Sequence, residues 1–213
     1  MIRICALDTS SAVGTFALAE ASDDDVRVIL EREQRTSNAH GESILPLIDA
    51  ACRDLEWSPW SINRFVVGVG PGSFTGTRIA TSLVLGIVMA TSAEAVAVSS
   101  FEVLSANEAN AIVFIDAMKG DRYAQTWRHG QPSEPVYLPA AAIEAWTRTE
   151  VGTAGPPLTL VGDVPDFAEL PVRVVRRPLV RAIEMIAIGL RKPPSMVLEP
   201  LYVREADIHV KTK

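Results

Sequence analysis

Three apolar segments follow one another closely at the start of the chain. Residues 2–9 and 14–20 are rich in apolar side chains, and residues 26–34 alternate between apolar and polar side chains. A short connection joins antiparallel strands, whereas a parallel pair needs a long crossover. The spacing therefore predicts an antiparallel meander of three strands.

From residue 41 the apolar residues recur at helical spacing, and helices then alternate with strands. The expected elements are a helix over 41–57, a strand over 64–69, a glycine-rich loop over 70–76, a helix over 77–91, a strand over 95–99 and a helix over 100–110. Three antiparallel strands followed by helix, strand, helix, strand is the order of a ribonuclease H-like or actin-like ATPase domain. We therefore expect one such domain over residues 1–110.

The second half of the chain has a weaker pattern. Its expected elements are a hairpin of residues 112–116 and 122–128, a helix over 140–149, a linker over 151–157, strands over 158–162 and 172–175, and a helix over 179–191. These elements are too few for a second full copy of the first domain. The fold class is therefore α/β, an actin-like domain with a mixed sheet plus a truncated second α/β subdomain over 111–213.

Composition and charge narrow the class of protein. Of the 213 residues, 48% are apolar, which excludes disorder, and the two cysteines, Cys5 and Cys52, are too few for a disulfide scaffold. Both have apolar neighbours in the sequence, which favours buried, unpaired thiols. The start of the chain does not have the build of a signal peptide, and no apolar run reaches the ~20 residues of a membrane helix. We expect a cytoplasmic protein that does not enter the membrane.

The charge is divided unevenly. Residues 1–171 hold 11 basic and 22 acidic residues, net −11, whereas residues 172–213 hold 9 and 4, net +5. An acidic body argues against a protein that binds nucleic acid on its own. The basic end could contact a phosphate backbone within an assembly, or it could simply be a solvated face.

The strongest local motif is the glycine-rich run from Gly68 to Arg78. A strand that leads through glycines into a helix can present backbone N–H groups to an anion. No lysine follows the last glycine as in a Walker loop, and the spacing is not that of a dinucleotide fingerprint. The residues that could contact a phosphate or nucleotide are Asp8, Gly70, Gly72, Ser73 and Gly76. The equally weighted alternative is a tight turn in which glycine lets the helix pack closely.

The sequence does not contain a recognisable set of catalytic or metal-binding residues. Besides Asp8, only Glu42 and Asp116 are plausible acidic partners for a metal, which makes a two-metal nuclease a weak hypothesis. The histidines, His40, His129 and His209, share no metal-ligand spacing, and Ser73 has no assignable base nearby. We therefore predict no catalytic residue, no metal site and no cofactor.

The helix expected over 77–91 is apolar nearly all round. One stripe is suited to the sheet and comprises Ile79, Leu83, Ile87 and Ala90. The opposite side, where a surface helix would place charges, carries Thr81, Leu85, Val88 and Met89. Either the domain's own second layer or a partner protein must cover that side, and the missing catalytic groups favour the partner.

Five collinear segments resemble the bacterial tRNA threonylcarbamoyladenosine biosynthesis protein TsaB family, also called YeaZ. They are Ala6-Leu-Asp-Thr-Ser10, His40-Gly-Glu-Ser-Ile-Leu-Pro46, Gly70-Pro-Gly-Ser-Phe-Thr-Gly-Thr-Arg-Ile79, Ile115-Asp-Ala-Met-Lys-Gly120 and Pro200-Leu-Tyr-Val-Arg204. The resemblance implies a non-catalytic subunit that binds and activates the related catalytic protein TsaD, with the ATPase TsaE joining the assembly. That assembly transfers threonylcarbamoyl to the adenosine next to the anticodon, so tRNA is reached only through the complex.

The resemblance also implies which surfaces meet. Two helices, near 41–57 and 77–91, should pack against the same helices of TsaD, or of a second copy when the chain is alone. The interface residues expected on them are Leu47, Ala51, Thr81, Leu85, Val88 and Met89. The catalytic sister family carries a metal-binding His-x-x-x-His whose positions correspond here to Ser100 and Leu104, neither of which can hold a catalytic metal.

Two other functions compete with the subunit. One is an actin-like nucleotide hydrolase or transferase that acts alone through Asp8 and the loop over 70–78. The other is a protease, an older description of the family, which the missing metal ligands argue against.

Overall fold

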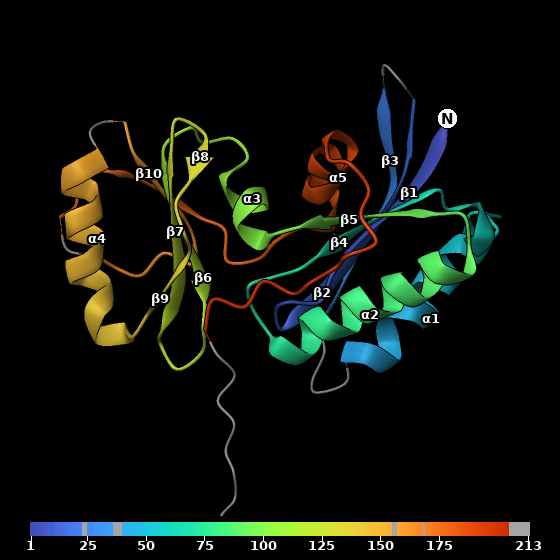
Figure 1. The fold of residues 1–213 in the computed structure, drawn as a ribbon, viewed down its shortest axis with the longest axis horizontal. Coiled ribbons are helices and arrows are strands. Elements are labelled where there is room, and N and C mark those ends of the chain that lie inside the picture. Colours follow the sequence, from blue (N-terminus) through green and yellow to red (C-terminus); the bar gives the residue numbers. More distant parts are fainter. Residues whose placement is uncertain (23–24, 36–39, 155–156, 168, 205–213) are drawn as a thin grey trace, which may run out of the picture.

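The computed structural model describes residues 1–22, 25–35, 40–154, 157–167 and 169–204. They form two lobes along the long axis of the molecule, each built on one sheet (Figure 1). The strands of the first sheet are β1 (Ile2–Asp8), β2 (Val13–Ala21), β3 (Val26–Arg35), β4 (Arg64–Gly68) and β5 (Glu94–Val98). Their order is β3-β2-β1-β4-β5, with β1 antiparallel to β2 and parallel to β4. This confirms the predicted meander and the mixed sheet.

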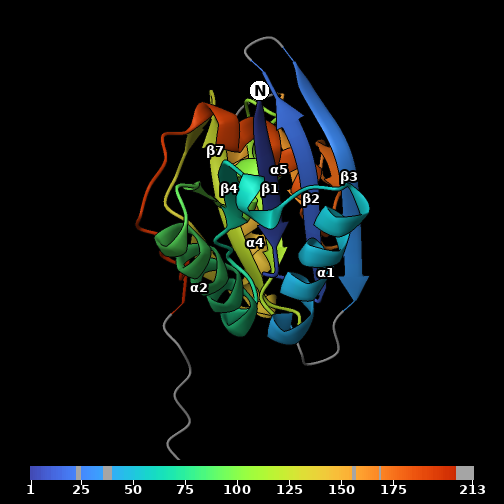
Figure 2. The ribbon, with the colours of Figure 1, turned by 90° about the vertical axis from the view of Figure 1, so that its right-hand side faces the viewer.

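Helices cover both faces of the first sheet (Figures 1 and 2). Helices α1 (His40–Asp54) and α2 (Phe74–Ala90) lie side by side on one face, and α5 (Ala182–Arg191) lies on the other. The face under α1 and α2 is closed by a core that includes Leu7, Phe16 and Val84. Under α5, Met185 and Ile186 pack on the opposite side of the same strands. A three-layer α/β/α lobe results.

Both cysteines belong to the core under α1 and α2. Cys5 and Cys52 are free and fully buried. Burial raises the pKa of each thiol, because the apolar surroundings disfavour a thiolate. The interpretation of these residues as small buried hydrophobes is confirmed.

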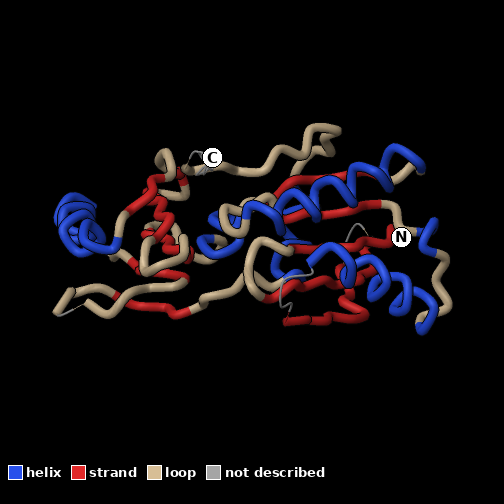
Figure 3. The backbone as a smooth tube through the Cα atoms, turned by 90° about the horizontal axis from the view of Figure 1, so that it is seen from below, coloured by secondary structure: helices blue, strands red, loops and turns tan. Residues whose placement is uncertain are grey.

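The second lobe contains the remaining strands. They are β6 (Ala111–Asp116), β7 (Arg122–Arg128), β8 (Gln131–Pro132), β9 (Val136–Leu138), β10 (Thr159–Gly162) and β11 (Arg173–Arg176). The sheet order is β11-β10-β6-β7-β8, and β9 pairs with β7. Helix α4 (Ala140–Ala154) packs on one side of this sheet and forms the outer end of the molecule (Figure 3), and α3 (Ser100–Ser105) packs on the other side. The hairpin of β6 and β7 was predicted, whereas the very short β8 and β9 were not.

Several element ends differ from the prediction. Helix α2 begins at Phe74 rather than residue 77, because the Ser73 hydroxyl accepts a hydrogen bond from Gly76 N and so caps an earlier turn. Helix α3 begins as predicted, in a capping box of Ser99 and Glu102, but ends at Ser105 rather than residue 110. Helix α4 runs past residue 149 into the expected linker.

The two lobes are not simple halves of the chain. The predicted boundary at residue 110 coincides with the start of β6, yet α5 comes after the second sheet in sequence and covers the first. The division into 1–110 and 111–213 remains a prediction. A last segment, residues 195–204, then runs from the first lobe to the second (Figure 1). It is fixed where Ser195 N donates to Ala95 O and Leu201 N donates to Val69 O.

Candidate functional site: the end of β1 and the outer face of α2

The glycine-rich loop lies directly against the carboxyl end of β1. A Cβ added to Gly76 would lie 1.8 Å from Thr9 O, and one added to Gly72 would lie 2.1 Å from Ser10 O. Neither backbone carbonyl can yield as a flexible side chain would. Glycine is therefore required at both positions by the close approach of two backbone segments.

The backbone N–H groups of the loop already donate hydrogen bonds within the protein. Ser73 N donates to Ser10 O, Gly76 N donates to the Ser73 hydroxyl at 3.1 Å, and Thr77 N donates to Ser73 O at 2.9 Å. An anion at this turn would have to replace these bonds. The five residues predicted to contact a phosphate do come together, but the geometry favours the tight turn over a phosphate site.

Asp8 is closed off within this arrangement, with 2% of its surface exposed. Its Oδ1 accepts hydrogen bonds from Ser10 N at 2.9 Å and from the Ser10 hydroxyl at 2.8 Å. Its Oδ2 lies against Gly68 and has no hydrogen-bond partner in the described part of the chain. Burial is the dominant effect and raises the pKa of Asp8, although the Ser10 bonds oppose it. A buried acid that anchors the turn through Ser10 fits these contacts better than a base that must reach a substrate.

The other candidate chemical groups do not join Asp8. Asp116 ends β6 in the second sheet, where its carboxylate accepts from Met118 N and lies 3.7 Å from Arg122. The Glu42 and His40 side chains and His209 lie outside the described residues. Within the ranges that the structure describes, no three His, Cys, Asp or Glu side chains gather closely enough to hold a metal ion.

Ser100 and Leu104 lie one turn apart on α3, and both are buried. The Ser100 hydroxyl has no hydrogen-bond partner among the described residues. Side chains of this kind suit packing between the lobes and offer no strong metal ligand.

The structure corrects the orientation of α2. Its buried residues are Gly76, Thr77, Ala80, Thr81, Val84 and Val88. The expected sheet-facing stripe is wrong: Ile79, Leu83 and Ile87 are only partly buried, and Ala90 is exposed. Small residues face the sheet because the glycine turn brings the start of α2 so close to β1.

The outer face of α2, which we define as Ile79, Ser82, Gly86, Met89 and Ala90, is exposed or partly exposed and carries no charge. Leu83 lies at its edge and packs partly against the core. Met89 is 74% exposed. A Cβ added to Gly86 would meet no atom within 4 Å, so nothing in this chain requires a glycine there. A glycine inside a helix costs about 1 kcal/mol relative to alanine, and on this face it leaves room for close approach from outside.

The six residues predicted for a partner interface are not equivalent. Thr81, Val88 and Ala51 are buried in this chain's own core, and Leu47 and Leu85 are partly buried against it. Met89 alone of the six is fully accessible. The sequence interpretation placed Ile79 and Leu83 on the sheet side and did not single out Gly86, whereas the structure leaves Gly86 exposed and Ile79 and Leu83 partly exposed. Leu83, like Leu85, also packs against the core.

Helix α1 packs beside α2 and also exposes an apolar side chain. Leu45 is 44% exposed, and farther along the helix Arg53 pairs with Asp49 at 2.9 Å. None of the helices in the described ranges has the length and the apolar character that a membrane crossing needs. The predicted cytoplasmic location remains a prediction.

The chain resembles known proteins in sequence and in fold. The family model described as TsaD, tRNA N6-adenosine threonylcarbamoyltransferase, matches residues 32–131. The chain is 32% identical over 106 residues to the tRNA threonylcarbamoyladenosine biosynthesis protein TsaB of Bacillus subtilis, a match covering 50% of this chain and 44% of that protein. It is 27% identical over 156 residues to the Escherichia coli protein of the same name, covering 67% and 65%. The chain spans about half the length of the first curated relatives it matches.

The fold has a close counterpart among solved structures. YeaZ from Pseudomonas aeruginosa superimposes with a TM-score of 0.69 at 21% identity, covering 95% of this chain and 100% of that one. This likeness, together with the strand order of the first sheet, confirms the actin-like α/β fold with a truncated second unit. The sequence matches place this chain close to the two proteins named TsaB, and the fold is that of the protein named YeaZ.

Proposed function

We propose that this chain is a non-catalytic subunit in tRNA threonylcarbamoyladenosine modification, where it binds and activates a TsaD-type catalytic subunit. The observation that carries the proposal is the uncharged outer face of α2, with Met89 exposed and Gly86 open to close approach. Exposed apolar surface of this kind is typical of protein interfaces. The matches to relatives named for this pathway support a partner from the same pathway, and the match of this chain to the TsaD family model is consistent with the pairing of two related folds.

The closed end of β1 supports a role without catalysis. Asp8 is buried and bonded to Ser10, and the loop amides of Ser73 and Gly76 are bonded within the protein. A nucleotide hydrolase acting alone would need these groups to reach its substrate. The same geometry therefore gives the hydrolase alternative no support.

The rest of the assembly follows from the same proposal. A TsaE-type ATPase would join the complex, tRNA would be reached through it, and the chain alone would form a homodimer through α1 and α2. In the homodimer two copies of the α2 face would cover each other, and TsaD would replace one copy.

The experiment is co-purification followed by reconstitution. The chain should co-purify with the TsaD-type protein of the same genome, and threonylcarbamoyl transfer to tRNA should require both. Transfer by the TsaD-type protein at full rate without this chain would overturn the proposal. So would ATP turnover by the purified chain that is lost in Asp8→Ala, since that result would make it the hydrolase.

A further inference from the structure

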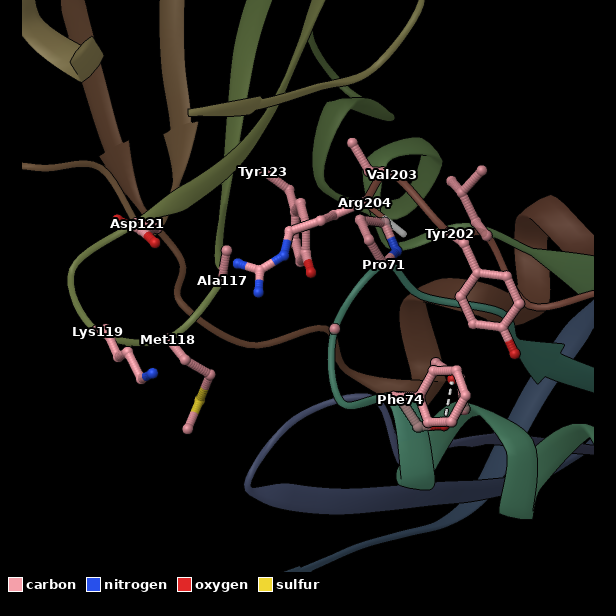
Figure 4. A pocket seen from close by; sticks show the side chains of 13 residues that line it. Pro71, Phe74, Ala117, Met118, Lys119, Asp121, Tyr123, Tyr202, Val203 and Arg204 are labelled. Atoms are coloured by element: carbon pink, nitrogen blue, oxygen red, sulfur yellow. Dashed lines mark hydrogen bonds between the residues drawn. The ribbon is translucent and has the colours of Figure 1, made fainter. Parts of the chain in front are cut away.

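A second open feature lies between the two lobes, and its lining includes no residue of the outer face of α2 (Figure 4). It is a cavity of about 710 Å³ bounded by the glycine turn and the start of α2, by the β6–β7 turn and by residues 201–204. Cavities of ~300–1,000 Å³ are the usual size for small-ligand sites. Three segments that are distant in the sequence therefore build one hollow.

One side of the cavity is aromatic. The rings of Phe74 and Tyr202 lie 5.3 Å apart at 33°, and Arg78 Cζ lies 4.5 Å from the centre of the Phe74 ring. Phe74 remains 43% exposed and Tyr202 50% exposed, so this Arg–Phe–Tyr stack still offers free aromatic surface. The hydrogen bond from Leu201 N to Val69 O fixes the segment that carries Tyr202.

The other side carries positive charge. Lys119 lies at the rim on the β6–β7 turn, and Arg204 extends from the last segment towards that turn (Figure 4). Arg204 donates to the Tyr137 hydroxyl at 2.9 Å, and Tyr137 in turn donates to Asp121. Asp121 also accepts from Ala140 N at 2.9 Å, so hydrogen bonds within the protein occupy this carboxylate. The cavity thus joins an aromatic surface to two cations, with one acid held by other partners.

An unpaired nucleotide has the complementary chemistry. Unpaired RNA bases stack on aromatic rings and on guanidinium planes, and lysine and arginine bind the phosphates that join them. We propose that this cavity binds one unpaired nucleotide of an RNA strand, with the base beside Phe74 and Tyr202 and a phosphate beside Lys119 and Arg204. The choice of RNA over a free nucleotide rests on the proposed function in tRNA modification.

The proposed contact involves one nucleotide, and capture of a whole tRNA would still need the complex. The test therefore uses a short strand: binding of a labelled single-stranded oligoadenylate RNA to the full chain at low salt, measured by fluorescence anisotropy. We expect Tyr202→Ala to weaken binding roughly tenfold, the loss of one base stack. Lys119→Ala should weaken binding and reduce the slope of log affinity against log salt by about 0.7, the value for one phosphate on a single strand. Trp60→Ala and Arg27→Ala remove an exposed aromatic ring and an exposed cation in the first lobe, away from the lining of the cavity, and should change neither quantity.

Several results would overturn the proposal. One is the absence of RNA binding by the unaltered chain. Another is binding by Tyr202→Ala and by Lys119→Ala that equals the binding of the unaltered chain. A third is displacement of the RNA by an equal concentration of AMP, which would indicate a mononucleotide site. A fourth is that both variants lose binding to the TsaD-type partner and keep binding to RNA, which would make the cavity a protein-docking site. Melting curves of both variants confirm folding. Failure of co-purification with RNA binding intact would count against the proposed function alone.

Discussion

Gly76 and Gly86 belong to the same helix but face opposite surroundings. A Cβ on Gly76 would lie 1.8 Å from Thr9 O, whereas a Cβ on Gly86 would meet nothing within 4 Å. At Gly76 the close contact is with β1 of the same chain, and at Gly86 the space is open. The same residue type is therefore required by internal packing at one end of α2 and is free of any such requirement on the outer face, where we propose that a partner binds.

Gly76→Ala should have the largest effect on stability of the substitutions at these two glycines. The added methyl group meets a backbone carbonyl that cannot move alone, so the first turn of α2 must separate from β1. We expect a loss of about 3 kcal/mol or more in the free energy of unfolding, measured by urea denaturation. A variant as stable as the original chain would show that the turn is not packed as described.

The stability of the folded chain should depend on pH through Asp8, the buried acid at the end of β1. Burial raises the pKa of Asp8 in the folded state, so the folded chain binds this proton more tightly than the unfolded chain does. Stability from this group is present below the unfolded pKa near 3.8 and is lost as the pH rises through the folded pKa. The loss amounts to about 1.4 kcal/mol for each pH unit in that window.

Asp8→Asn removes the titration, so the variant should gain stability relative to the original chain across that window. Asp54→Asn, at an exposed position at the end of α1, is the matched control for the loss of one carboxyl group. Denaturation at a series of pH values gives both curves. Parallel curves for Asp8→Asn and the original chain would show that folding does not raise the pKa of Asp8.

Gly86→Ala is the smallest expected change and has the opposite sign to Gly76→Ala. Since the site is open and helical, alanine should stabilise the monomer by about 1 kcal/mol. Thermal or urea unfolding of a dilute sample measures it. Destabilisation would mean that Gly86 is needed by this chain's own fold, and the contrast between the two glycines would fail.

The order of elements in the first lobe could be predicted because each signal is local. Short connections specify the meander of β1, β2 and β3, and the apolar runs specify β4 and β5. The placement of α5 on the first sheet could not be predicted, because it depends on contacts of Met185 and Ile186 with strands at the far end of the chain.

The orientation of α2 illustrates a different limit. After Arg78 the helix carries no charge, so hydropathy does not distinguish the face towards the sheet from the face towards solvent. Close packing decides instead, and it selects the small residues Thr77, Ala80 and Thr81. The aromatic cavity was missed for a related reason: Phe74 and Tyr202 meet only through the path of residues 195–204 between the lobes.

Met89→Glu tests the proposed association with a TsaD-type subunit through the outer face of α2. Met89 is 74% exposed, so the monomer should stay folded, whereas Leu85 packs partly into the core and would confuse folding with binding. Trp60→Glu, at a 73% exposed position in the short 3-10 helix Pro59–Ser61, controls for an added charge elsewhere. Binding to the TsaD-type protein, measured by calorimetry with circular dichroism as the folding check, should weaken roughly 100-fold or more in Met89→Glu, because a buried charge without a counter-ion is costly at the centre of an interface. Unchanged affinity in a folded Met89→Glu variant would contradict the account.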